Sequence, residues 1–259
     1  MKIAVSGKGG VGKTTLSAML AAALAMKGRG VIAIDADPDA NLASALGVAP
    51  AEQPTPVAEM RELITQRTGA TDGYGGYFKL NPKVDDIPET YARQIGSIRL
   101  LVLGGISRGG GGCLCPASAL VKALVTHLVL GKDDAIVMDM EAGIEHLGRA
   151  TAQSMDALIV VVNESPWSVQ TALRVRDLAG DIGLKGLFAV ANAVREPANL
   201  ERIRGELGEI PLIGHLPYDE QLRTAVVGVA ADGGLEPSKA LAAHLATVEG
   251  ILSALPPAG

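Results

Sequence analysis

Residues 7–15 read GKGGVGKTT and match the phosphate-binding pattern GxxxxGK[ST]. The apolar run KIAVSG precedes them and the helix-like stretch TTLSAMLAAALAM overlaps their end, so the motif joins a predicted strand to a predicted helix. Glycines let the backbone curl until its amide groups point at phosphate oxygens, and the start of a helix favours an anion. The stretch therefore predicts a P-loop at the edge of an α/β sheet.

Two side chains of this motif carry its chemistry. Lys13 is expected to contact the β- and γ-phosphates of a nucleotide, and the Thr14 hydroxyl is expected to bind Mg²⁺. The other nucleotide-binding positions of the motif are Gly9, Gly10, Val11, Gly12 and Thr15. A glycine-rich turn that binds nothing is the alternative, and the predicted strand and helix argue against it. Lys8 is a further positive charge that the motif does not require, so it is either a solvated surface lysine or a functional one.

The rest of the 259-residue chain alternates short apolar runs with helical patterns. The runs are rich in Val, Ile and Leu, as buried parallel strands are; they read GVIAID, IRLLVLGG, AIVMDM, ALIVVVN, GLFAVAN and PLIGHLP. This alternation predicts an α/β fold, with a doubly wound, mostly parallel sheet and helices on both faces. We interpret residues 1–259 as one P-loop ATPase domain with a polar insertion at about 49–97. Within it we expect a helix near Val57 to Arg67 and then irregular surface chain.

Composition narrows the classes of function. The formal net charge of −5, from 23 basic and 28 acidic residues, argues against nonspecific nucleic-acid binding. The N-terminus lacks the apolar core of a secretory signal, and no apolar run approaches the roughly 18 residues that span a bilayer. Two cysteines are too few for a disulfide framework and favour a reducing compartment. We expect a cytoplasmic protein with neither membrane nor nucleic acid as a partner.

Carboxylates stand at the ends of two predicted strands. The run GVIAID continues into DADPDAN, residues 35–41, and AIVM continues into DMEAG, residues 139–143. Ligands bind at the carboxyl ends of parallel strands, and apolar residues followed by Asp form the Walker B pattern. Asp139 is therefore expected to hold Mg²⁺. Glu141 and Gly143 would form a second switch, the glycine offering a backbone N–H to the γ-phosphate; ordinary polar loop residues are the alternative for Glu141.

The stretch GGGGCLCP, residues 109–116, holds both cysteines of the chain, Cys113 and Cys115. They could be small buried hydrophobes, an internal disulfide or incidental. Pro116 is a natural first residue of a helix, and the field at a helix start favours thiolates, which bind soft metals. Two thiolates are half of a tetrahedral four-sulfur site, and a two-fold symmetric homodimer would supply the other half. The hypothesis is a metal site between two subunits.

The segment KGGVGKTT resembles the deviant Walker A family of MinD, ParA, the nitrogenase iron protein and the arsenite-pump ATPase. That resemblance implies that Lys8 reaches across a dimer interface to the partner's nucleotide and acts in catalysis with Lys13. It also implies that Asp37, the aspartate before the proline, positions the attacking water and contributes to the Mg²⁺ site. Asp39 or Asn41 could instead cap the following helix.

The same resemblance assigns the nucleotide base. It implies that Asn192, at the end of GLFAVAN, hydrogen-bonds adenine, although Ala193 stands where most relatives have lysine. It also implies that Leu216, Pro217 and Tyr218 of the LPYD segment line the adenine pocket. The expected nucleotide is therefore ATP, with Mg²⁺.

A narrower resemblance rests on five segments between residues 7 and 152, namely KGGVGKTT, DADPDANLASALG, FKLNPKVDDIPETY, GGGGCLCP and DMEAGIEHLGRATA. Together they resemble the CooC-type nickel-insertion accessory ATPases of carbon monoxide dehydrogenase. The resemblance implies a nucleotide-switched dimeric metallochaperone that hydrolyses ATP, holds Ni²⁺ or Zn²⁺ at the CxC pair and serves carbon monoxide dehydrogenase. An iron–sulfur carrier or reductase like the nitrogenase iron protein is the alternative, and a MinD- or ParA-like positioning ATPase fits less well. The segment VVNESPWSV departs from the family, which tends to show Glu-Pro-Ser there, so Asn163 and Glu164 have no assigned role.

Overall fold

The computed structural model describes residues 1–70, 77–104, 115–128, 133–141, 155–184 and 186–257. Within these ranges an eight-stranded sheet runs in the order β3-β4-β2-β5-β1-β6-β7-β8. Its strands are β1 (Lys2–Gly7), β2 (Val31–Asp35), β3 (Arg93–Ile95), β4 (Ile98–Val102), β5 (Ala135–Asp139), β6 (Ala157–Val162), β7 (Leu187–Val194) and β8 (Leu212–Pro217). All neighbouring strands are parallel except β3 and β4. The predicted mostly parallel sheet is confirmed.

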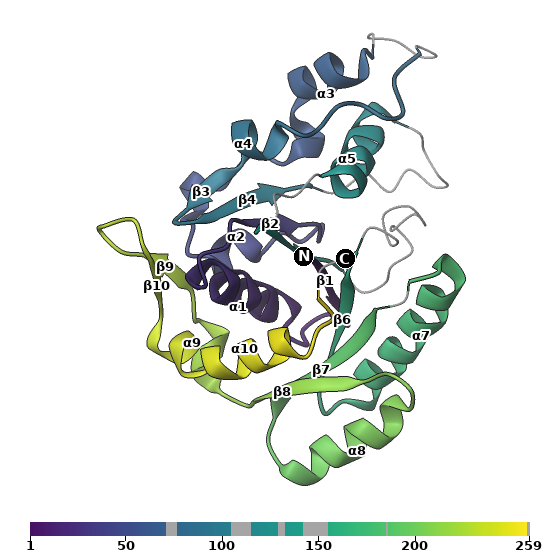
Figure 1. Cartoon of the computed structure of the whole chain (residues 1–259), viewed down its shortest axis with the longest axis vertical. Helices are drawn as coiled ribbons and strands as arrows, with labels where there is room; N and C mark the ends of the chain where they lie inside the picture. The colour runs from purple at the N-terminus through teal and green to yellow at the C-terminus, as the bar shows by residue number, and fades with distance from the viewer. Residues whose placement is uncertain (71–76, 105–114, 129–132, 142–154, 185, 258–259) are drawn as a thin grey trace.

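Helices cover both faces of this sheet (Figure 1). The described helices are α1 (Lys13–Met26), α2 (Leu42–Ala45), α3 (Arg61–Thr68), α4 (Ile87–Tyr91), α5 (Pro116–His127), α7 (Pro166–Ile182), α8 (Pro197–Leu207), α9 (Lys239–Ala243) and α10 (Leu245–Ser253). Helices α1 and α10 lie along one side of the row of strands, and α5, α7 and α8 lie along the other (Figure 1). The fold is doubly wound, as predicted.

Strand β6 shows why the apolar runs of the sequence are continuous. Ile159 and Val161 belong to the core beneath α1, whereas Val160 and Val162 pack on the side of α7 and α8. Successive side chains of a strand point to opposite faces, so a strand covered on both faces needs apolar residues at every position. The whole of β6 is buried.

The strand order places the P-loop near the middle of the sheet. Strand β1 lies between β5 and β6, and β5 pairs on its other side with β2. The carboxyl ends of β1, β2 and β5 therefore meet at one edge, where open α/β sheets bind ligands. This edge brings together the P-loop and the two acidic strand ends.

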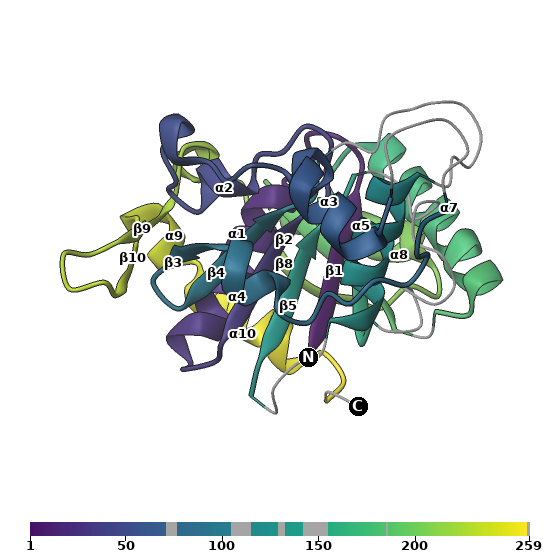
Figure 2. The same ribbon diagram turned by 90° about the horizontal axis from the view of Figure 1, so that it is seen from above.

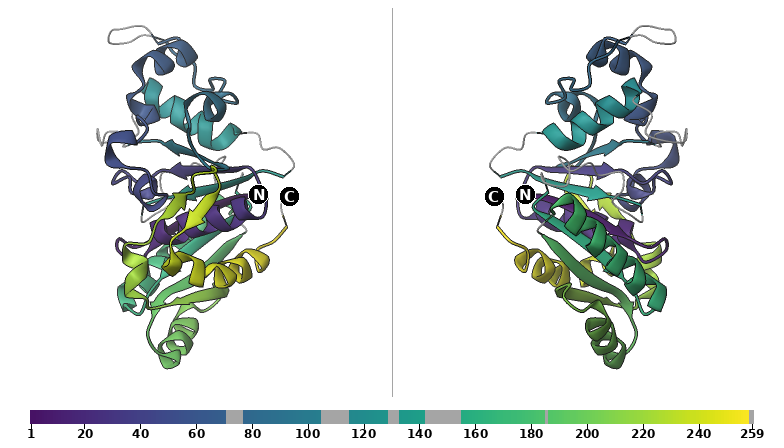
Figure 3. Two further views of the ribbon diagram at one scale, coloured as in Figure 1. Left: turned by 90° about the vertical axis from the view of Figure 1, so that its left-hand side faces the viewer. Right: turned by 90° about the vertical axis from the view of Figure 1, so that its right-hand side faces the viewer.

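The segment 49–97 is more regular than the sequence predicts. A helix does lie in the expected place, as α3 after a 3₁₀ turn at Val57–Glu59, but the chain that follows is not wholly irregular. It forms α4 and then β3, which pairs antiparallel with β4. Ile64 and Ile87 are buried in a core to which α5 and the sheet also contribute, so apolar contacts organise the segment. The helices of the segment lie beside the teal helix α5 and the strands (Figure 3). The expectation of irregular surface chain is wrong here because these contacts are not visible in a local pattern.

Two further features lie toward the C-terminus. Strands β9 (Val227–Val229) and β10 (Leu235–Pro237) form an antiparallel hairpin that projects from the body of the protein (Figure 2). Helix α10 buries Val248 and Ile251 in the core that α1 shares. Among the described residues, no helix combines the length and the apolar character needed to cross a membrane.

Candidate nucleotide-binding site

The P-loop leaves β1 at Gly7 and enters α1 at Lys13. Gly10 and Gly12 have φ angles of 79° and 95°, in the left-handed region that favours glycine. A second constraint keeps glycine at position 12, because a Cβ there would lie 2.0 Å from Nδ2 of Asn192. Val11 is buried, whereas Lys8, Gly9 and Gly10 are exposed. The loop is thus anchored at its end and open along its first half.

Lys13 and Asp37 meet across this loop. Nζ of Lys13 lies 3.8 Å from Oδ2 of Asp37, and their side chains are 8% and 19% exposed. Asp37 belongs to the loop after β2, so the juxtaposition comes from the pairing of β2 with β5, next to β1. A phosphate would offer Lys13 a stronger anion than one carboxylate does. A bound nucleotide would therefore compete with Asp37 for the Lys13 ammonium.

Asp139 is buried at the end of β5 and is hydrogen-bonded to the first turns of α1. Its Oδ2 accepts a hydrogen bond of 2.6 Å from the Thr14 hydroxyl, and its Oδ1 accepts one of 3.1 Å from Ser17. Burial raises the pKa of Asp139 to about 6, although the two hydroxyls and Lys13 oppose the rise. Hydroxyl and carboxylate oxygens are hard ligands that suit Mg²⁺. Thr14 and Asp139, with Asp37 nearby, thus form a donor set that fits this ion.

Asp35 organises the loop that carries Asp37. Its Oδ1 accepts the backbone N–H of Asp37 at 3.2 Å, and its Oδ2 accepts that of Leu42 at 2.8 Å. Burial raises the pKa of Asp35 to about 7; the Leu42 amide opposes this and the nearby Asp139 adds to it. Asn41 precedes α2 but makes no side-chain cap, so Asp35 satisfies the Leu42 amide instead.

The ends of β7 and β8 lie beside the P-loop. Asn192 donates its Nδ2–H to the carbonyl of Val11 at 2.8 Å. Because that carbonyl can only accept, Oδ1 of Asn192 is left to accept a hydrogen bond, and adenine offers an amino group. Leu216 is buried, whereas Pro217 and Tyr218 are exposed, and the Arg195 guanidinium stacks 3.6 Å from the centre of the Tyr218 ring. This corner has the polarity and the flat surfaces that an adenine base requires.

The family model for the CobQ/CobB/MinD/ParA nucleotide-binding domain matches residues 2–227. The chain belongs to this family. It is 45% identical over 228 residues to the carbon monoxide dehydrogenase accessory protein CooC of Rhodospirillum rubrum, covering 87% of this chain and 86% of that protein. It is also 45% identical over 226 residues to an uncharacterized ATP-binding protein of Methanocaldococcus jannaschii, covering 86% and 87%.

Solved structures of the family share the fold. The MinD cell division protein of Aquifex aeolicus superposes with a TM-score of 0.62 at 22% identity, over 100% of this chain and 99% of that one. A ParA family ATPase of Chlorobium tepidum gives a TM-score of 0.63 at 19% identity, over 99% and 92%. With the sequence relatives, the family assignment makes this protein a P-loop ATPase.

Of the two residues predicted to form a second switch, Glu141 lies within the described part of the chain. The backbone carbonyl of Glu141 accepts a hydrogen bond of 3.0 Å from the Ser6 hydroxyl, which ties the end of β5 to β1. Gly143 lies outside the described residues. The role expected for this pair as a second switch stays a prediction.

Cys115 caps the first turn of α5, and Pro116 opens that helix as predicted. The Cys115 Sγ accepts the Ser118 backbone N–H at 3.4 Å and lies 3.2 Å from the Ser118 hydroxyl oxygen. Burial raises the pKa of this thiol, but hydrogen bonds from Ser118 and backbone amides outweigh burial, so its pKa is lowered overall. Cys113 lies outside the described residues, and the described part of the chain holds no group of three or more His, Cys, Asp or Glu side chains placed to bind a metal ion.

The sequence did not single out several residues of the site. Ser17 follows Thr14 by three positions, so helical spacing could have placed it beside Asp139. Asp35 stands at a strand end within DADPDAN, and its burial could have been inferred from the apolar run before it. Arg195 carries no sequence signal, because its contact with Tyr218 depends on the pairing of β7 with β8.

Proposed function

We propose that this ATPase is a nucleotide-switched dimeric metallochaperone that inserts nickel into carbon monoxide dehydrogenase. The observation that carries the proposal is the 45% identity, over 87% of this chain, to the carbon monoxide dehydrogenase accessory protein CooC. Hydrogen bonds from Ser118 lower the pKa of the Cys115 thiol at the start of α5, which supports a thiolate metal ligand. We further propose that the chain acts as one domain, with the segment 49–97 as part of it.

ATP binding is assigned to the P-loop and its neighbours. In this proposal the amide groups of Gly9 to Thr15 surround the phosphates, and Lys13 exchanges Asp37 for the β- and γ-phosphates. Bound Mg²⁺ would neutralise phosphate charge, held by Thr14 and Asp139 with Asp37. Asp37, released from Lys13, is free to orient the attacking water. Its position next to Lys13 supports this role.

The base site is assigned to the edge formed by β7 and β8. Asn192 accepts a hydrogen bond from the adenine amino group, since its own amide is engaged by Val11. A guanine base carries an acceptor at that position and would be rejected. Leu216 and Pro217 line the base, and the Arg195–Tyr218 stack covers it. The proposal therefore predicts a preference for ATP over GTP.

Dimerisation is assigned to Lys8 and to the cysteines. Lys8 is exposed and does not pair with Asp37 or Asp139, so it is available to a nucleotide on a second subunit. Cys113 and Cys115 from both subunits would provide four thiolates for the transported metal, Ni²⁺ or Zn²⁺. ATP and metal would then favour the same dimer, and each would strengthen the binding of the other.

A membrane-acting switch like MinD is less well supported. The similarity to the MinD structure, at 22% identity, establishes the fold alone. One fold can serve ATPases with different functions. The apolar side chains Val248 and Ile251 of α10 are buried in the core, so this helix has no free apolar face of the kind a membrane anchor needs.

The proposal is tested by metal analysis and mass determination on the same purified protein. Nickel or zinc is added with a nonhydrolysable ATP analogue and Mg²⁺, and unbound metal is removed. We expect one metal per dimer in the wild-type protein and in His127→Ala, a control at the opposite end of α5. The double variant Cys113→Ser, Cys115→Ser should lose the metal. Metal bound to a strict monomer, or metal retained by the double variant, would overturn the proposal.

Visible absorption distinguishes the iron–sulfur alternative. After anaerobic reconstitution with iron and sulfide, a cluster carried by the same cysteines would give a coloured protein whose absorption disappears in the double variant. We expect no stable cluster absorption at conditions in which nickel or zinc binds. A stoichiometric cluster would favour the carrier function over nickel insertion.

A further inference from the structure

The first lysine of the P-loop contacts the single tryptophan of the chain. Nζ of Lys8 lies over the ring of Trp167, 5.9 Å from its centroid. An ammonium within about 6 Å of an indole face is attracted by the ring quadrupole. Trp167 is nevertheless 64% exposed, so the ring is not a core residue. Lys8 is therefore partnered in the free subunit rather than simply solvated.

Strand pairing explains why these two residues meet. Strands β1 and β6 are parallel neighbours, with Gly7 opposite Val161. A Cβ on Gly7 would lie 2.5 Å from the Val161 carbonyl oxygen, so glycine permits this close approach. Lys8 follows directly after β1, and Trp167 lies in the first turn of the helix that follows β6. Both side chains thus emerge at the same edge of the sheet.

The turn before Trp167 is held rigidly. The Ser168 hydroxyl accepts the Asn163 N–H at 3.0 Å and lies 2.7 Å from the Ser165 carbonyl. The Glu164 carboxylate accepts the Arg195 N–H at 2.7 Å and the Asn199 amide at 2.9 Å, which ties this turn to α8. The segment that departs from the family pattern therefore holds the backbone turn that carries Trp167.

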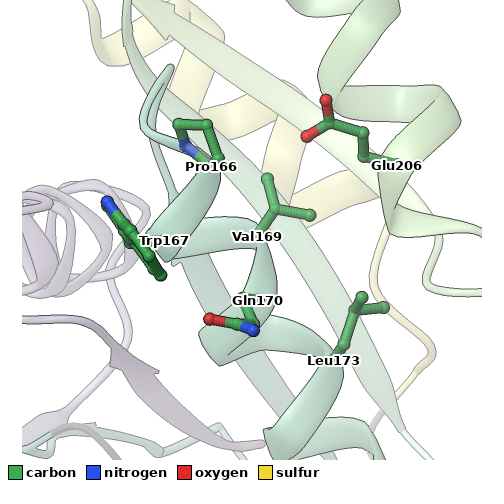
Figure 4. A pocket seen from close by; sticks show the side chains of 6 residues that line it. All are labelled: Pro166, Trp167, Val169, Gln170, Leu173 and Glu206. Atoms are coloured by element: carbon green, nitrogen blue, oxygen red, sulfur yellow. The ribbon is translucent and has the colours of Figure 1, made fainter.

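Lys8, by contrast, stands on the open half of the P-loop. No atom lies within 4 Å of a Cβ placed on Gly9 or Gly10, so the backbone after Lys8 is not packed. An exposed ring on a hydrogen-bonded turn and a lysine on unpacked backbone form a contact that can open without repacking the core. The ring also borders an open groove of about 440 Å³ between α7 and α8, lined by Pro166, Trp167, Val169, Gln170, Leu173 and Glu206 (Figure 4).

We propose that Trp167 is a positioning residue that retains Lys8 in the free subunit and releases it when Lys8 reaches the triphosphate of a second copy. This inference rests on the dimer role proposed for Lys8. A phosphate is a stronger partner for an ammonium than an aromatic ring is, so a partner subunit loaded with ATP displaces the contact. The ring thereby opposes association until the triphosphate is present.

The test compares Trp167→Leu with Trp167→Phe. Leucine keeps an apolar side chain without a π face, whereas phenylalanine keeps the ring. Sedimentation velocity with a nonhydrolysable ATP analogue and Mg²⁺ gives the dimerisation constant. We expect Trp167→Leu to dimerise about 5- to 30-fold more tightly, since two lysines no longer lose a ring contact, and Trp167→Phe to stay within about threefold of wild type. Gln170→Ala, in the same groove, should behave as wild type.

Fluorescence supplies a readout without nucleotide. Trp167 is the one tryptophan of the sequence, so its emission reports on the contact directly. We expect the emission maximum of Lys8→Met to differ from that of the wild-type protein. Identical emission spectra, equal dimerisation of the leucine and phenylalanine variants, or tighter dimerisation of Gln170→Ala would overturn the inference while leaving the dimer role of Lys8 intact. A wild-type protein that stays monomeric with the analogue would overturn both.

Discussion

At Gly12, both the local backbone geometry and a side chain distant in sequence require glycine. Its φ of 95° disfavours any side chain, and Asn192 occupies the space a Cβ would need. Asn192 lies there because it bonds the Val11 carbonyl of the same loop. A single glycine thus links the phosphate loop to the site proposed for the base.

Replacing Gly12 with Ala should weaken ATP binding by about tenfold or more, because the loop must change conformation to relieve roughly 1–2 kcal/mol of backbone strain and the clash with Asn192. Isothermal titration calorimetry measures the effect. Gly180→Ala is the matched control, since Gly180 lies in helix α7 with no atom within 4 Å of a new Cβ. The control should bind ATP normally and gain about 0.5–1 kcal/mol of stability. Equal ATP affinity of the two variants would contradict this account of Gly12.

Asp139 predicts a pH dependence of stability in the nucleotide-free protein. Its folded pKa of about 6 is raised above the ordinary value of 3.8 by burial, so the folded state binds this proton more tightly than the unfolded chain does. Its contribution to the free energy of unfolding is complete below about pH 4 and is lost as pH rises through about 6. Asp35, with a pKa raised to about 7, acts in the same direction.

Asp139→Asn should therefore stabilise the nucleotide-free protein at pH 8 by roughly 2–3 kcal/mol at most, while reducing ATP turnover. Thermal unfolding between pH 4 and pH 8 tests this: stability of the wild-type protein should fall more steeply with rising pH than that of the variant. If the stability of the two proteins changed with pH in parallel, ionisation of the buried Asp139 carboxylate would not be destabilising the folded protein.

At the scale of elements, Glu164 joins two connections that are distant in sequence. Its side chain accepts hydrogen bonds from the β7–α8 connection and from α8, and Arg202 of α8 donates to its backbone carbonyl at 2.8 Å. The Arg195 N–H is the main reason that the pKa of Glu164 is lowered. This carboxylate fixes the start of α7 relative to α8, and with it the position of Trp167.

Glu164→Ala should reduce the free energy of unfolding by about 1–3 kcal/mol, because it removes two hydrogen bonds to a charged acceptor. Glu164→Gln keeps an acceptor oxygen and should lose less. Urea denaturation measures both variants. A larger loss in the glutamine variant than in the alanine variant would mean that the hydrogen bonds accepted by the side-chain oxygen are not what Glu164 contributes to stability.

At the level of the assembly, the residues assigned to ATP binding by one P-loop belong to a single subunit, whereas the proposed function requires two subunits. Lys8→Ala should leave ATP binding by the single subunit nearly unchanged and weaken ATP-dependent dimerisation by about tenfold or more, since it removes one charge-assisted contact from each subunit. Sedimentation in the presence of the ATP analogue tests this. Lys27→Ala, at the opposite end of α1, is the control and should dimerise as the wild type does. An unaltered monomer fraction in Lys8→Ala would contradict the proposed role.

Much of the fold could be predicted from local pattern. The P-loop lies between β1 and α1 as expected, because glycine spacing and the flanking apolar runs are local properties that neighbouring elements do not change. The buried strands were recognisable because a strand covered on both faces needs apolar side chains throughout. The segment 49–97 was only partly predicted, because α4 and β3 are stabilised by contacts with β4 that no local window contains.

Local residue patterns are enough to define the class of this protein, because a phosphate loop, acidic strand ends and a paired cysteine motif are each made of residues a few positions apart. Which of these groups meet depends on the folded chain. Lys13 contacts Asp37, Asn192 contacts the P-loop, and Lys8 contacts Trp167, because parallel strands bring the ends of β1, β2, β6 and β7 to one edge of the sheet. Those contacts join residues up to 181 positions apart, and strand order, which local propensity does not encode, sets them.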